Sequence, residues 1–184
     1  MKKIAYLAGL LDSQGTIGVK VGKRAGHYTF GYVIEPYVNF TQGKPREEFV
    51  RKVKDLLGMG HIHRHTEKIR RTLVHKHVTQ KVQAWATLRV TRESDLLTMV
   101  QAIKPHLIFK HRQAELMITI LEKKRQGKHR SLKGFLECLD LAYDLRMQST
   151  FPTRMTWTTK ERFDRIRSEA TQNYQDWSSR TTHA

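Results

Sequence analysis

Residues 7–15 read Leu-Ala-Gly-Leu-Leu-Asp-Ser-Gln-Gly, and this short stretch decides how the rest of the chain is interpreted. Apolar residues recur at helical spacing over residues 3–12, which predicts a helix that Gly15 ends. Ala8 and Gly9 have almost no side chain, so a second helix could approach this one closely. Polar side chains just beyond the last apolar turn would then converge with those of the partner helix.

The pattern after this helix changes to that of strands. Residues 16–24 alternate apolar and polar side chains, and residues 28–42 are rich in aromatic and β-branched residues. Both patterns are typical of strands, and a short turn between them predicts a hairpin. Pro36 inside the second strand indicates a sheet edge or a bulge, because proline cannot donate a ladder hydrogen bond. A helix is expected next, from Pro45 to about residue 57.

A second pair of strands and a third helix complete the expected core. The strands are predicted over residues 61–65 and 82–91, and the helix over residues 92–104. The basic segment between the strands is either the tip of a long hairpin or a mobile loop. Because the strands come in adjacent pairs between helices, the sequence predicts an α+β fold with an antiparallel sheet. Further helices are expected at about 110–126, 131–148 and 158–176.

Composition points to a polyanionic partner. Lys and Arg number 34 against 17 acidic residues, giving a net charge of +17 and a pI near 10.3. Such an excess favours nucleic acid. No stretch approaches the roughly 20 apolar residues of a spanning helix, and no targeting peptide is seen, so no membrane partner is expected. Cys138 is expected to be a core thiol. We expect one domain over residues 1–184, with its core at about 4–126 and C-terminal helices at about 131–176.

Three segments together resemble a known family. Residues 7–15 match the LAGLIDADG signature at seven of nine positions when Leu11 is accepted for Ile. Residues 39–46, Asn-Phe-Thr-Gln-Gly-Lys-Pro-Arg, resemble the end of the family's second strand. Residues 105–114, Pro-His-Leu-Ile-Phe-Lys-His-Arg-Gln-Ala, resemble the segment that brings a basic residue to each active site. The chain is similar over roughly residues 4–170 to the single-motif homing endonucleases that organellar introns encode.

The resemblance implies an activity and an assembly. Such proteins are homodimers that use Mg²⁺ to make double-strand breaks at a long pseudo-palindromic site in double-stranded DNA. One motif per chain supplies one of the two packed helices, and the residues expected at this dimer interface are Leu7, Ala8, Gly9 and Leu11. The resemblance also implies an organellar (chloroplast or mitochondrial) or a prokaryotic cytoplasmic location.

The resemblance also assigns site residues, with one departure from the family pattern. Gln14 stands at the position of the metal-binding acid, and the main chain of Gly15 is implied as a further metal contact. The family's residue at the position of Asp12 mainly caps and orients, and its carboxylate is a secondary candidate for metal contact. Gln42 stands at the position of the polar residue near the metal-bound water. The remaining catalytic positions fall on Arg46 and Lys110.

Gln14 calls the cutting activity into question. Glutamine is neutral, whereas Mg²⁺ prefers anionic oxygen ligands. Three interpretations stay open: a homing endonuclease impaired at Gln14, a non-cleaving DNA-binding regulator, and an intron maturase that binds RNA.

The strands are expected to present alternate residues to DNA in the major groove. The inner face is expected to hold the apolar residues Ile17, Val19, Val21, Ile34, Val38, Phe40 and Ile62. The outer face is expected to hold Lys20, Arg24, Glu35, Tyr37, Asn39, His63, His65, Thr87 and Arg89. Phosphate contacts are expected from Arg70, Arg71, Lys76 and Lys81.

Overall fold

The computed structural model describes residues 2–24, 29–43, 47–65, 68–71, 79–82, 85–148 and 155–182. Its α-helices are α1 (Lys2–Gln14), α2 (Glu47–Leu57), α3 (Glu93–Ile103), α4 (His111–Arg125), α5 (Leu132–Gln148) and α6 (Met155–Thr182). Its strands are β1 (Gly15–Lys23), β2 (Tyr32–Gly43), β3 (His61–His65), β4 (Lys68–Arg71), β5 (Thr79–Val82) and β6 (Trp85–Val90). Two short 3-10 helices are η2 (Lys104–His106) and η3 (Lys128–Arg130).

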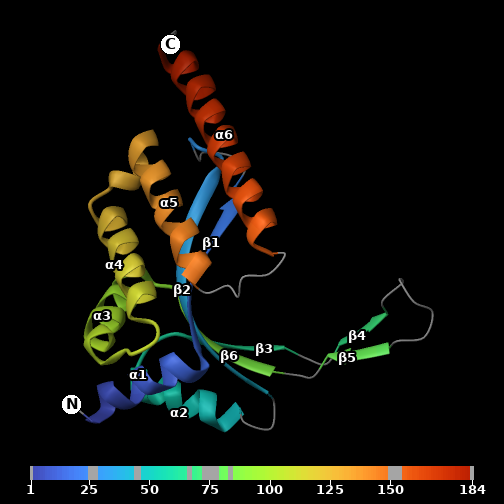
Figure 1. The fold of residues 1–184 in the computed structure, drawn as a ribbon, viewed down its shortest axis with the longest axis vertical. Helices are drawn as coiled ribbons and strands as arrows, with labels where there is room; N and C mark the ends of the chain where they lie inside the picture. The colour runs from blue at the N-terminus through green and yellow to red at the C-terminus, as the bar shows by residue number, and fades with distance from the viewer. Residues whose placement is uncertain are drawn as a thin grey trace.

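One antiparallel sheet organises the molecule. Its four strands lie in the order β1-β2-β6-β3, and β4 and β5 form a separate two-stranded hairpin that projects to one side (Figure 1). Helices α1 to α5 pack against strands of the four-stranded sheet. The α+β class and the antiparallel arrangement expected from the sequence are confirmed.

The core lies between the sheet and the helices. The expected inner residues of β1 and β2 are all buried, and they pack with apolar residues of every α-helix. Ile62 is partly buried against the same core. Cys138 is fully buried in α5, as expected, and burial raises the pKa of its thiol.

The change from α1 to β1 takes place without a loop. A Cβ added at Gly15 would lie 2.9 Å from Cα of Leu11, closer than any ordinary contact. Glycine therefore lets the strand begin immediately after the helix. As a result the end of the motif helix lies directly beside the first strand.

Two elements differ in detail from the sequence expectation. The strand expected over 82–91 is two strands, because Val82 ends β5 and pairs with Lys68 of β4, whereas β6 begins only at Trp85. Pro36 lies in the part of β2 that pairs with β1 alone, because pairing with β6 starts at Val38. Strand β2 is therefore an edge strand around Pro36, as predicted, and a central strand from Val38 onward.

The last helix is longer than expected and is fixed to the β1–β2 hairpin. Glu169 of α6 accepts hydrogen bonds from Tyr32 at 2.6 Å and from Lys23 at 3.0 Å. Asn173 donates to the carbonyl oxygen of Phe30 at 3.1 Å. Among the described residues, no helix combines the length and the apolar character needed to cross a membrane.

Candidate nucleic-acid interface

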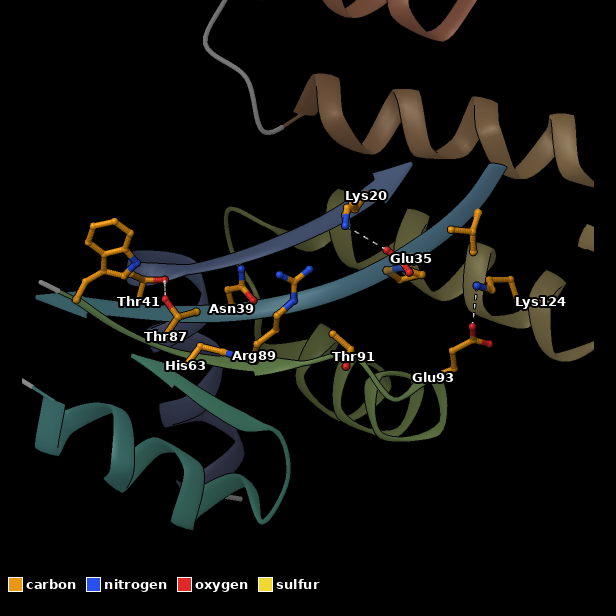
Figure 2. A pocket seen from close by; sticks show the side chains of 13 residues that line it. Lys20, Glu35, Asn39, Thr41, His63, Thr87, Arg89, Thr91, Glu93 and Lys124 are labelled. Carbon is orange, nitrogen blue, oxygen red and sulfur yellow. Dashed lines mark hydrogen bonds and ion pairs between the residues drawn. The ribbon is translucent and has the colours of Figure 1, made fainter. Parts of the chain in front are cut away.

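The face of the sheet opposite the helices carries a groove of about 880 Å³. Six of the residues predicted for the outer face line it: Lys20, Glu35, Asn39, His63, Thr87 and Arg89 (Figure 2). They come from β1, β2, β3 and β6, so every strand of the sheet contributes. The alternation of the sequence therefore placed this face correctly.

Ion pairs organise the end of the groove near the β1–β2 hairpin. Glu35 contacts Arg24 at 2.9 Å and Lys20 at 3.7 Å. The hydrogen bond from Arg24 is the main reason why the pKa of Glu35 lies below its usual value. Glu35 is therefore ionised and holds two exposed cations at the rim.

The groove floor is built from polar side chains that contact one another. The hydroxyls of Thr41 and Thr87 form a hydrogen bond of 3.0 Å, and Thr87 is only 8% exposed. Its accessible surface is therefore small for a residue expected to contact DNA. Arg89 lies over the ring of Tyr37, with its guanidinium carbon 4.5 Å from the ring centroid. The side-chain oxygen of Asn39 is buried and has no hydrogen-bond partner in the part of the chain that the structure describes.

Some predicted contacts cannot be placed, and some lining residues were not predicted. Lys76 lies outside the described residues, and the same holds for the side chains of His65, Arg70, Arg71 and Lys81. Thr41, Trp85, Thr91 and Lys124 line the groove but were missed. Thr41 could have been predicted by extending the alternation of the second strand two residues beyond Asn39. Lys124 lies in a helix, and nothing in the sequence indicates that this helix reaches the open face of the sheet.

The end of α1 brings the predicted catalytic side chains together. Gln42 of β2 donates a hydrogen bond to the side-chain oxygen of Gln14. The ammonium group of Lys110 donates to the carbonyl oxygen of Leu11 at 2.7 Å and to that of Asp12. Burial lowers the pKa of Lys110, and the negative charge of Asp12 partly offsets this effect. Segments almost 100 residues apart in the chain therefore meet at one point.

Asp12 has a defined structural role at this point. Its two carboxylate oxygens accept backbone N–H groups of Ile108 at 2.7 Å and of Lys110 at 2.9 Å. The carboxylate thus fixes the turn that carries Lys110. Arg46, the fourth predicted catalytic residue, lies outside the described residues.

The donor set at the end of α1 does not fit a hard divalent cation. The oxygen of Gln14 is neutral and already accepts from Gln42, and both oxygens of Asp12 bind backbone N–H groups. Across the described ranges, no group of three or more His, Cys, Asp or Glu side chains could hold a metal ion. A second copy of the chain would add another neutral Gln14. Among the described residues at the end of α1, the Asp12 carboxylate is therefore the one anionic group, and it already holds the turn.

The face of α1 that is open to a partner differs from the predicted one. Leu7, Ala8 and Leu11 are buried in the chain's own core, because their helix face packs against the sheet and α3. A Cβ at Gly9 would meet no atom within 4 Å, so Gly9 alone of the four predicted residues lies on an open face. Large apolar side chains exposed at this end of the molecule are Tyr6, Ile108 and Phe109, which are 53%, 80% and 82% exposed.

Solved structures match this chain, although no family model does and a search of curated proteins found no match. The archaeal intron-encoded homing endonuclease I-Vdi141I, complexed with DNA, gives a TM-score of 0.70 at 19% identity, covering 94% of this chain and 96% of that one. I-CvuI, in complex with its target in the presence of Ca, gives 0.65 at 19% identity, covering 90% and 94%. The LAGLIDADG meganuclease I-CpaMI, bound to uncleaved DNA, gives 0.62 at 16% identity, covering 89% and 49%.

These matches extend over the whole arrangement of motif helix, antiparallel sheet and flanking helices. At such low identity they establish the architecture, and they agree with the resemblance found in the motif segments. The chain adopts the LAGLIDADG homing-endonuclease fold.

Proposed function

We propose that this protein is a homodimeric, sequence-specific binder of double-stranded DNA of the homing-endonuclease type, whose cutting is impaired by Gln14. The observation that carries the proposal is the groove on the open sheet face, lined by polar and basic side chains from all four strands. The net charge of +17 supplies the attraction for a polyanion. The structural neighbours I-CvuI and I-Vdi141I were solved with their DNA, which supports the same partner here.

The four-stranded antiparallel sheet suits duplex DNA. The major groove of B-DNA is about 12 Å wide and admits antiparallel strands. Lys20 and Arg24 at the hairpin end would meet phosphates, because exposed cations position a duplex without reading its sequence. Asn39 and Arg89 on the floor have the donor and acceptor groups that base edges require.

The homodimer is proposed from the open face of α1. Gly9 leaves space for a second helix to approach, and the exposed Ile108 and Phe109 offer apolar surface nearby. The hydrogen bond from the Ile108 backbone to Asp12 keeps these side chains beside the end of α1. A symmetric pair would place two sheets on two half-sites of a pseudo-palindromic sequence.

The second candidate function, a regulator that binds without cutting, is favoured by the neutral Gln14–Gln42 pair. I-CvuI was solved in the presence of Ca with its own target, and in the presence of Mg with a target that was not cleaved. In the present chain we propose that Mg²⁺ supports cutting only when an acid occupies position 14. Binding itself needs no metal, since the groove residues that carry it lie outside the Gln14 site.

Binding is tested by fluorescence anisotropy with a duplex selected from a randomised pool, in EDTA and over a series of salt concentrations. We expect binding in EDTA and an affinity that falls steeply as salt rises, because phosphate contacts release counterions. Two double variants are compared. The variant with Lys20→Ala and Arg89→Ala should bind the duplex much more weakly than the variant with Lys160→Ala and Arg180→Ala, which removes the same charge from α6.

Three results would contradict parts of this picture. Equal losses from the two double variants would exclude the groove as the binding surface. Tighter binding to RNA of the same sequence would favour the maturase interpretation. The absence of any duplex binding would refute the proposed function.

A further inference from the structure

Tyr37 lies across the neighbouring strand, and a glycine makes this possible. Tyr37 of β2 pairs directly with Gly18 of β1. A Cβ added at Gly18 would lie 2.6 Å from Cζ and 2.7 Å from the hydroxyl oxygen of Tyr37. Any larger residue at position 18 would therefore displace the ring.

The ring in turn supports an arginine. The guanidinium carbon of Arg89 lies 4.5 Å from the centroid of the Tyr37 ring, a cation–π arrangement. Arg89 is on β6 and pairs across the ladder with Asn39 of β2, next to which it lies in the groove (Figure 2). Within the described ranges, the one interaction recorded for the Arg89 side chain is the contact with Tyr37, so its N–H donors are available to a ligand.

The position of this arginine distinguishes it from the cations at the rim. Lys20 and Arg24 are exposed and share Glu35, whereas Arg89 is half-buried on one of the two central strands. A duplex whose major groove receives this sheet face would present base edges to the floor of the protein groove and phosphates to its rim. A planar guanidinium held in place loses less freedom on binding than an unsupported one.

We propose that Gly18, Tyr37 and Arg89 form a fixed element that reads one guanine in each half-site. The inference rests on the proposed DNA-binding function and adds the base that is recognised. Arginine donates two parallel hydrogen bonds to O6 and N7 of guanine, a pattern that no other base offers in the major groove. Tyr37 acts as a positioning residue that orients the guanidinium, and Gly18 acts only by making room for the ring.

The test compares base preferences of variants by selection from a randomised duplex pool and sequencing of the bound fraction. The wild type should prefer guanine at one position in each half-site. Arg89→Lys keeps the charge but loses the planar fork, so this preference should fall about five-fold or more while other positions stay unchanged. Gly18→Ala should weaken the preference at the same position, although it leaves Arg89 itself intact.

Gly22→Ala is the matched control on the same strand. A Cβ at Gly22 would meet the Lys20 side chain at an ordinary distance of 3.8 Å. The guanine preference of the Gly22→Ala variant should therefore equal that of the wild type. If Gly18→Ala does not fold, Tyr37→Leu removes the same ring from the open face and should give the same loss of preference.

The outcomes separate this inference from the proposed function. Failure of the wild type to bind any duplex would refute the proposed function itself. Binding with no guanine preference that depends on Arg89 would overturn only the reading element. A uniform loss across all sequences in Arg89→Lys would also overturn it, since that result identifies a phosphate contact. An unchanged preference in both Gly18→Ala and Tyr37→Leu would refute the positioning role of the ring.

Discussion

At the scale of single residues, one carboxylate connects the motif helix to the segment that carries Lys110. Asp12 accepts two backbone N–H groups from that segment, and Lys110 returns hydrogen bonds to the carbonyl end of α1. The motif and the resemblance predicted that Gln14, Gln42 and Lys110 lie at one site, and the structure brings these three residues together at the end of α1. The resemblance implied that Asp12 caps and orients, but it did not identify the backbone N–H groups of Ile108 and Lys110 as the partners, because a backbone partner leaves no mark on the sequence.

Removing this carboxylate should therefore destabilise the protein. In Asp12→Ala two backbone donors lose their acceptor. Loss of the acceptor of the part-buried Lys110 N–H should cost about 1–3 kcal/mol, whereas the exposed Ile108 N–H can bind water instead and should cost less. Thermal unfolding followed by circular dichroism should show a clearly lower Tm. Ser13→Ala is the control, because in the part of the chain that the structure describes the Ser13 hydroxyl bonds only to carbonyl oxygens of its own helix. Equal melting temperatures for Asp12→Ala and Ser13→Ala would contradict the role given to Asp12.

At the scale of elements, alternation and helical spacing predicted most of the core but could not assign partners. The apolar residues at even positions from Val82 to Val90 continue one period-two pattern, so they read as a single strand. The structure divides them because Val82 pairs with β4 and Trp85 begins pairing with β2 and β3. Strand pairing depends on contacts between distant segments of the chain. The periodicity of one segment carries no information about its partner.

The attachment of α6 should depend on pH through Glu169. The hydrogen bond that Tyr32 donates to Glu169 is the largest cause that lowers the pKa of Glu169, and the hydrogen bond from Lys23 is the second. Burial, together with the hydrogen bond to Glu169, raises the pKa of Tyr32 to about 12. A depressed carboxyl pKa contributes stability above the unfolded value near 4.5 and loses it as pH falls through the folded value. Hydrogen exchange should therefore show α6 well protected at neutral pH and less protected in acid.

Glu169→Gln provides the comparison. This variant should have weaker protection of α6 at neutral pH, and much less change between neutral and acidic pH. If wild type and variant lose protection in parallel as pH falls, another group controls the docking of α6.

At the scale of the whole molecule, helical spacing could not distinguish a face buried by the same chain from one buried by a partner. Leu7, Ala8 and Leu11 belong to the first class, and Gly9 lies on the open face. Gly9→Leu should therefore fold normally as a single chain but keep a second helix away. Light scattering should show that Gly9→Leu shifts the protein from the dimer toward the 21.6 kDa monomer. Thr98→Leu adds a leucine at another exposed helix position and serves as the control, so its oligomeric state should equal that of the wild type. Comparable Tm values of the two variants would show that Gly9→Leu still folds.

A dimer that withstands Gly9→Leu would place the interface elsewhere. A wild type that is a stable monomer at micromolar concentration would refute the homodimer altogether.

We propose that the protein holds duplex DNA and does not cut it, because the neutral amide of Gln14 stands where the family has an acid. The direct measurement compares cleavage of a tightly bound, selected duplex by the wild type and by Gln14→Glu, in Mg²⁺ and in EDTA. We expect equal affinity, no cutting by the wild type, and Mg²⁺-dependent double-strand breaks by Gln14→Glu, because the substitution adds an anionic oxygen with almost no change of volume. Cutting by the wild type as fast as by Gln14→Glu would contradict the claim.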